Sequence, residues 1–232
     1  MQPVRHYSDP YEGLEAQLAE LRGLVRIVPP LIDTDRNRRW DELGKRAGDP
    51  DEEMIDIYES EAGPEERWGH ADFARTLYST AIVTAWETFN VYLVRQLFEG
   101  CLNYNFSEYP VLAKLIEDER RTWERRFENV IRRYKDFAQI NLSSLSSWEA
   151  VVHARELRHA LVHNLGWYTP AYLKTKRARR PAKEHWDFYI PDTDDGLVDN
   201  EPIPLDRVFS EQVIADLLTA GKEVNEALRG GR

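Results

Sequence analysis

The apolar side chains of residues 69–99 form the strongest regular pattern of the sequence, and this pattern limits which folds are open to the chain. They recur at spacings of three and four, the period of a helix with one wide buried face. This face consists of Phe73, Leu77, Ala81, Ile82, Ala85, Trp86, Phe89, Tyr92, Leu93, Leu97 and Phe98. Gly100 follows as a C-terminal stop signal. A helix with so wide an apolar face has to be buried, so the rest of the chain must supply its packing partners.

Other segments show the same helical spacing. Residues 11–28 form an amphipathic helix, which Pro29 and Pro30 are expected to stop because proline lacks an N–H donor and clashes with the preceding turn. Three more helices are predicted: from Val111 to about Lys135, from Trp148 to about Asn164, and from Ser210 onward. The flanking helices therefore provide the surfaces against which the central one can pack.

The segment before the last predicted helix has a different pattern. Residues 187–190 and 203–205, on either side of a turn at 194–196, read as a small β-hairpin. We therefore expect a mostly α fold, a helical bundle with a small C-terminal β-hairpin before the last helix. Residues 1–68 are interpreted as an N-terminal helix and acidic loop extension, and residues 69–232 as the helical domain.

Charge is distributed unevenly along the chain, whose net charge is -10. Residues 1–72 carry 18 acidic against 9 basic residues, and residues 184–232 carry 12 against 4. Residues 73–183 reverse the balance, with 11 acidic against 18 basic residues. Exposed charges act over only about 8–10 Å at physiological salt. The basic centre can therefore still meet phosphate, although the whole chain is acidic.

Cysteine content and hydropathy indicate where the protein works. The single cysteine, Cys101, excludes an internal disulfide and fits a reducing compartment. The first residues contain no apolar stretch typical of a secretion signal, and no apolar run approaches the length of a membrane span. We expect a cytoplasmic protein without a membrane partner.

A polar cluster lies on the predicted helix 148–164. Arg158, His159 and His163 belong to it, and Asn164 and Gly166 can end the helix because both tolerate positive φ. A neutral imidazole can take the proton of a ribose 2′-hydroxyl, and a protonated one can supply a proton to the leaving oxygen. A guanidinium stabilises the charge that develops on phosphorus. These residue types suit cleavage of a phosphodiester, and we expect no metal or other cofactor to be needed for it.

The spacing of the cluster raises the question of how it is completed. Arg158 and His163 are five residues apart, about 140° around a helix, so we expect one copy to form an incomplete pocket and a homodimer to complete it. Glu87, on the long helix, is a candidate partner for Arg158; the alternative is a glutamate on the solvent edge. His159 and His163 also have zinc-ligand spacing, but the nearest further histidine is six residues back. A structural role for the arginine and histidines is the remaining alternative.

A dense basic run follows the cluster. It contains Lys174, Lys176, Arg177, Arg179 and Arg180. Such runs are commonly solvated loops, but directly after the cluster these residues are also well placed to hold an RNA backbone. We therefore interpret them as candidate RNA-binding residues.

The run Arg158-His-Ala-Leu-Val-His163-Asn-Leu-Gly166 resembles the Arg-x4–6-His signature of HEPN-domain proteins, in which His-Asn-x-Gly commonly closes the helix. The run Ala85–Phe89 is similar to the first core helix of that family, and the resemblance covers roughly residues 70–228. It implies Arg158 and His163 as catalytic residues. His159 stands at an auxiliary polar position that more often holds asparagine.

HEPN domains are α-helical bundles, usually dimeric, and many are metal-independent ribonucleases of toxin–antitoxin, phage-defence or RNA-processing systems. The resemblance thus implies an endoribonuclease with RNA as substrate, a second copy as partner, and an antitoxin or other defence protein as a further partner. Many members are inactive. The alternative is therefore a non-catalytic HEPN module that binds a partner protein or a nucleotide, which the acidic flanks favour.

Overall fold

The computed structural model describes residues 9–47, 70–101, 127–179 and 202–230, and this part of the chain is mostly helical. Three long helices are α1 (Pro10–Ala47), α4 (His70–Arg95) and α9 (Arg207–Gly230). The shorter ones are α6 (Phe127–Arg133), α7 (Trp148–His163) and α8 (Pro170–Lys174). Two π-helical turns, Gln96–Cys101 and Tyr134–Ala138, extend α4 and α6, and a 3₁₀ turn lies at Leu142–Ser144. No strand is present within these ranges.

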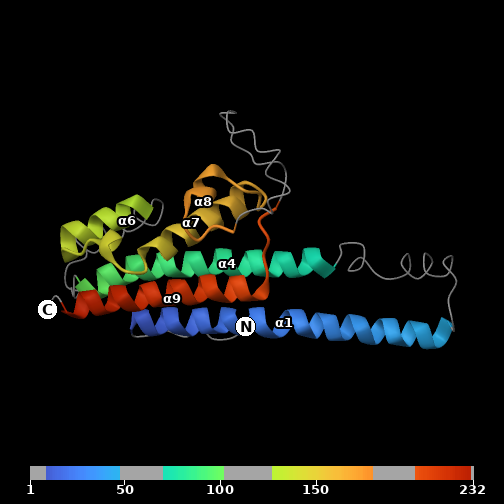
Figure 1. Cartoon of the computed structure of the whole chain (residues 1–232). Coiled ribbons are helices and arrows are strands. Elements are labelled where there is room, and N and C mark those ends of the chain that lie inside the picture. The colour runs from blue at the N-terminus through green and yellow to red at the C-terminus, as the bar shows by residue number, and fades with distance from the viewer. Residues whose placement is uncertain (1–8, 48–69, 102–126, 180–201, 231–232) are drawn as a thin grey trace, which may run out of the picture.

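The three long helices lie side by side and form the core (Figure 1). Leu18 of α1, Phe89 of α4 and Leu217 of α9 are fully or almost fully buried in one cluster. Two buried hydrogen bonds join α4 to α9: the Tyr92 hydroxyl donates to the Gly221 carbonyl at 2.9 Å, and Gln96 Nε2 donates to Asn225 Oδ1 at 3.0 Å. The apolar face predicted for residues 69–99 is therefore confirmed from Ala81 to Phe98, whereas Leu77 is only partly buried and the side chain of Phe73 lies outside the described residues.

The first helix does not stop at Pro29, as the sequence predicted, but continues to Ala47. The fixed φ of proline is compatible with a helix, and the cost lies in the missing N–H and in crowding of the preceding turn. Pro29 lies on the buried side of α1, and the Thr34 hydroxyl donates to the Pro30 carbonyl at 2.8 Å. Beyond the prolines, α1 runs past the first turn of α9 (Figure 1).

The N-terminal helix belongs to the same core as the rest of the described chain. Leu14, Leu18 and Val25 are buried together with residues of α4 and α9. A Cβ at Gly221 of α9 would lie 2.3 Å from Cδ2 of Leu14, so a larger residue at this position would displace the buried Leu14 side chain. The predicted boundary at residues 68 and 69 lies outside the described residues and stays a prediction.

A second layer, made of α6, α7 and α8, covers the side of α4 that faces away from α1 (Figure 1). Phe127 of α6 packs between Trp86 of α4, at 5.0 Å between ring centroids, and Trp148 of α7, at 5.9 Å. The predicted helix 148–164 is confirmed as α7. Of the predicted helix 111–135, the structure describes only the part from Phe127 onward.

The predicted β-hairpin is not formed in the described residues. Its first arm, 187–190, and its turn lie outside them, and its second arm, 203–205, is extended without being a strand. One isolated antiparallel bridge joins Pro202 to Trp167, and the Ile203 N–H donates to the Gly166 carbonyl at 2.8 Å. Pro202 and Pro204 have no N–H to donate, which confines this segment to an edge position. Asp206 then caps α9 by accepting the Phe209 N–H at 2.8 Å, and the helix begins before the predicted Ser210.

Candidate functional site

The polar cluster lies on the last turns of α7. Leu157 and Ala160 are fully buried and fix the helix on the core, whereas His159 and His163 are exposed. The helix ends as expected for an Asn-x-Gly sequence: the Asn164 and Gly166 N–H groups both donate to the Ala160 carbonyl, at 3.1 and 2.9 Å. Asn164 is thus the C-cap residue of α7 and ends the helix directly after the cluster.

The backbone after Asn164 turns through positive φ. Leu165 has a φ of 54° and Gly166 a φ of 78°. Glycine adopts this region at no steric cost, but leucine rarely does. The Leu165 side chain is 76% exposed. The turn therefore holds an apolar side chain out into solvent directly beside the polar cluster.

Glu87 of α4 binds Arg158, as the sequence suggested. Arg158 Nε donates to Glu87 Oε1 at 2.9 Å, and Nη2 lies 2.7 Å from the same oxygen. The Arg158 side chain is 29% exposed and that of Glu87 46%. Glu87 is thus both a partner of Arg158 and a residue of the solvent edge. The carboxylate fixes two of the three guanidinium nitrogens and leaves the third directed elsewhere.

That third nitrogen contacts His163. Arg158 Nη1 lies 3.3 Å from His163 Nε2, so the two residues meet within one chain, contrary to the expectation from their angle around the helix. That one copy forms an incomplete pocket, which a second copy completes, stays a prediction. An angle of 140° describes the Cα positions, but the long arginine side chain reaches around the helix. Because a guanidinium can only donate, His163 Nε2 is the acceptor in this contact.

His159 is the third member of the cluster. Its ring centroid lies 4.8 Å from that of His163, with a tilt of 46° between the rings. Together, Glu87, Arg158, His163 and His159 place a carboxylate, a guanidinium and two imidazoles in a row, with both imidazoles exposed. Such a row can bind an anion through the guanidinium and exchange protons through two neighbouring rings.

The basic run after α7 is tied to acidic side chains. Lys176 pairs with Glu149 of α7, and Arg177 pairs with Asp216 of α9. The cations of this part of the predicted RNA-binding surface are thus neutralised by the protein itself. Lys174 is exposed, and Arg180 lies outside the described residues.

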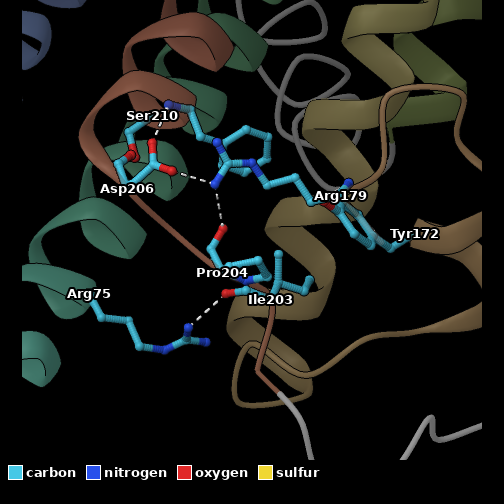
Figure 2. A network of polar contacts seen from close by, with 8 residues as sticks. Arg75, Tyr172, Arg179, Ile203, Pro204, Asp206 and Ser210 are labelled. Carbon is cyan, nitrogen blue, oxygen red and sulfur yellow. Dashed lines mark hydrogen bonds and ion pairs between the residues drawn. The ribbon is translucent and has the colours of Figure 1, made fainter. Parts of the chain in front are cut away.

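Arg179 is the most firmly held residue of the run (Figure 2). Its Nη1 binds Asp206 Oδ2 at 2.5 Å and the Pro204 carbonyl at 3.2 Å. Its guanidinium carbon lies 4.3 Å from the centroid of the Phe209 ring, and its backbone N–H donates to the Tyr172 hydroxyl at 2.9 Å. In this structure Arg179 connects the segment after α8 to the start of α9.

Arg75 of α4 contributes a link that the sequence analysis missed. Its Nη1 donates to the Ile203 carbonyl at 2.7 Å and its Nη2 to the Gly166 carbonyl at 3.3 Å; Figure 2 shows the first of these contacts. Arg75 thereby joins the turn that ends α7 to the segment that leads into α9. An isolated arginine at the edge of an apolar helix gives no sequence signal for such a contact.

His153 lies on the buried side of α7, away from solvent. Its ring packs on Tyr172 at 5.5 Å and on Phe209 at 5.8 Å, and its Nε2 has no hydrogen-bond partner among the described residues. Burial lowers the pKa of His153 to about 4, the charge of Arg177 acts in the same direction, and Asp216 opposes them. His153 is therefore a neutral core residue at physiological pH.

Comparisons with known proteins give no assignment: no family model, no curated protein and no solved structure matches the chain. The described ranges hold no group of three or more histidine, cysteine, aspartate or glutamate residues arranged to bind a metal ion. None of the described helices combines the length and the apolar character needed to cross a membrane. The function has to be argued from the cluster on α7.

Proposed function

We propose that the protein is a metal-independent endoribonuclease of the HEPN type and that Arg158, His163 and His159 carry the reaction. The observation that supports this proposal is the position of the Arg158 guanidinium between the Glu87 carboxylate and the exposed His163 imidazole. The helical bundle and the cluster at the end of α7 agree with the resemblance to HEPN proteins. The role in a toxin–antitoxin or phage-defence system is part of the same proposal and rests on that resemblance.

The reaction begins when a phosphate oxygen of the RNA accepts a hydrogen bond from Arg158 Nη1. The contact of this nitrogen with His163 is long for a hydrogen bond, so a charged phosphate oxygen is the stronger partner. His163 Nε2 is then free to accept the proton of the 2′-hydroxyl. Glu87 keeps the guanidinium in place because it binds the other two nitrogens.

The 2′-oxygen then attacks phosphorus, a new P–O2′ bond forms, and the P–O5′ bond breaks. Protonated His159 donates its proton to the leaving 5′-oxygen, and Arg158 stabilises the charge on the pentacovalent phosphorus. The products are a 2′,3′-cyclic phosphate and a 5′-hydroxyl. The reaction as written requires neither a redox step nor a metal-bound water.

Cleavage of single-stranded RNA in the presence of EDTA tests the proposal. Arg158→Ala and His163→Ala are expected to lower the rate by on the order of 10²–10⁴-fold, as for loss of an acid–base group or a charge-stabilising donor. Arg155→Ala is the matched control, because Arg155 lies on the same helix and pairs with Glu128 instead. Mass spectrometry should show cyclic phosphate ends. Equal cleavage by all three variants, or none by the wild type, would disprove the enzymatic proposal.

A second candidate function has its own support. Lys176, Arg177 and Arg179 are bound to acidic residues, which leaves the presumed RNA surface with fewer available cations than the sequence suggested. A non-catalytic HEPN module that binds a partner protein or a nucleotide fits this neutralised surface. Isolation of a stable complex without any nuclease activity would favour it.

A further inference from the structure

The outer side of α1 carries an apolar stripe that the described bundle leaves uncovered. Leu24, Ile27 and Leu31 are 50%, 58% and 61% exposed, and they follow one another at spacings of three and four. The buried face of the same helix is formed by Leu14, Leu18 and Val25. Helix α1 therefore has two apolar faces, of which the three-helix core uses one.

The outer stripe continues with the same spacing in both directions. Glu20 lies four residues before Leu24, Thr34 three residues after Leu31, and Arg38 four residues after Thr34. All six residues are exposed. Alternating spacings of three and four are the pattern of the seam along which two helices pack in a coiled coil. The seam has an acidic residue at one end and a basic residue at the other.

We propose that a second copy of the chain packs on this stripe, with the two α1 helices antiparallel. A two-fold axis at the level of Pro29 places Ile27 opposite Leu31 of the other copy, because both are two residues from Pro29. The same axis places Glu20 opposite Arg38, each nine residues from Pro29. Ile27 and Leu31 then meet as apolar pairs at the centre, Leu24 lies opposite Thr34, whose hydroxyl is bonded within its own helix, and each end of the seam forms an ion pair.

The charges also select the direction of pairing. In a parallel pair, equivalent residues would face each other, with Glu20 against Glu20 and Arg38 against Arg38. Like charges opposite one another oppose association. Arg38 binds Asp35 at 2.5 Å and lies 3.9 Å from Glu42 in its own chain, but it remains 66% exposed and has five N–H donors. Its remaining N–H groups can therefore donate to a further carboxylate.

The stripe and the proposed ribonuclease site lie on different sides of the molecule. Helices α4 and α9 separate α1 from α7 (Figure 1). Pairing through α1 therefore leaves Arg158, His159 and His163 of both copies open to solvent. Since Arg158 and His163 already meet within one chain, this dimer does not need to bring two clusters together. The inference is independent of the proposed function.

Sedimentation equilibrium of the full chain tests the proposal. The wild type is expected to have the mass of two chains, and the double variant Ile27→Glu/Leu31→Glu to dissociate with a Kd raised by about tenfold or more. Leu165→Glu is the control, because Leu165 is equally apolar and exposed but lies beside α7. Circular dichroism verifies that each variant is folded.

A charge exchange separates this arrangement from any other dimer. Glu20→Arg and Arg38→Glu alone should each weaken association, and the two together should restore it, because the ion pair is then re-formed with reversed polarity. A monomeric wild type, a dimer that survives the stripe substitutions, or a double charge variant no better than the single ones overturns the proposal. Dissociation by Leu165→Glu alone would assign the interface to the α7 side and would equally overturn it.

Discussion

Arg158 Nη1 lies 3.3 Å from His163 Nε2, although the two residues are on different sides of α7. The contact depends on Glu87, which holds the other two guanidinium nitrogens at 2.7 and 2.9 Å. A single helix thus presents an arginine and a histidine as one unit only because a second helix fixes the arginine. This relationship gives Glu87 a positioning role that can be measured.

Replacement of Glu87 tests that role. Glu87→Gln should lower RNA cleavage by on the order of 10- to 100-fold, because a misplaced catalytic group loses that much through orientation. The effect should appear in kcat more than in KM, and Glu87→Asp should restore part of it. Glu128→Gln, which removes the carboxylate that pairs with Arg155 of α7, should leave the rate unchanged. Unchanged cleavage by Glu87→Gln would exclude the positioning role.

His153 should make the fold sensitive to acid. Its pKa is about 4 in the folded protein against an ordinary value of 6.5, so the unfolded chain binds the proton more readily between these values. The free energy of unfolding is not reduced by His153 above about pH 6.5. It falls by about 1.4 kcal/mol per pH unit as the pH drops toward 4, because the unfolded chain then binds the proton that the folded chain excludes. The total loss is about 3 kcal/mol from this group.

Urea unfolding between pH 4 and pH 7 measures this dependence. His153→Leu removes the titrating ring, so the free energy of unfolding of this variant should fall less steeply toward pH 4. The environment of His153 includes Arg177, Asp216 and Tyr172, so Asp216→Asn should steepen the fall by removing the one nearby charge that favours the protonated ring. Parallel curves for wild type and His153→Leu would contradict the prediction.

Gly221 of α9 lies against the buried side chain of Leu14 in α1. A Cβ at this position would lie 2.3 Å from Leu14 Cδ2, in a part of the core where Leu14 is almost fully buried. Gly221→Ala should therefore destabilise the protein by about 1–3 kcal/mol, as overpacking of a core does. Gly230→Ala is the control on the same helix, since a Cβ there meets nothing within 4 Å. Thermal unfolding of both variants gives the comparison.

Arg75 should contribute to stability and to the closure of the turn after α7. Arg75→Met removes the donors to the Ile203 and Gly166 carbonyls, and hydrogen bonds from a charged group are each worth about 1.5–3 kcal/mol. We expect a loss of about 2–3 kcal/mol in urea unfolding. Arg207→Met, which removes only a 3.9 Å surface contact with Glu211, should change the stability little. Equal losses for both variants would deny Arg75 a special role.

Helical periodicity predicted α4 and α7 well because each has one face that the core requires to be apolar. Proline gave the wrong end for α1, since the sequence does not reveal that Pro29 is itself part of the buried face. The predicted hairpin is not supported: of its two arms only 203–205 is described, it is not a strand, and Pro202 and Ile203 contact the chain after α7. A local sequence pattern predicts the conformation of a segment, but the segment with which it pairs depends on the whole fold.

The contacts within the predicted cluster could be foreseen only in part. The contact between Glu87 and Arg158 followed from a carboxylate on an apolar helix that needed a cation. The contact between Arg158 and His163 did not, because helix angles ignore the reach of a long side chain. The neutralised basic run was also missed, since its acidic partners Glu149, Asp206 and Asp216 are far away in the sequence.

Helix α4 reaches the end of α7 twice, through Glu87 on Arg158 and through Arg75 on the Gly166 carbonyl. The final turn of α7 consequently cannot fray by itself, since opening it breaks contacts with the helix at the centre of the core. Amide hydrogen exchange in this turn should then follow global unfolding rather than local opening. The chain would keep Arg158, His159 and His163 in place relative to one another until the whole bundle unfolds.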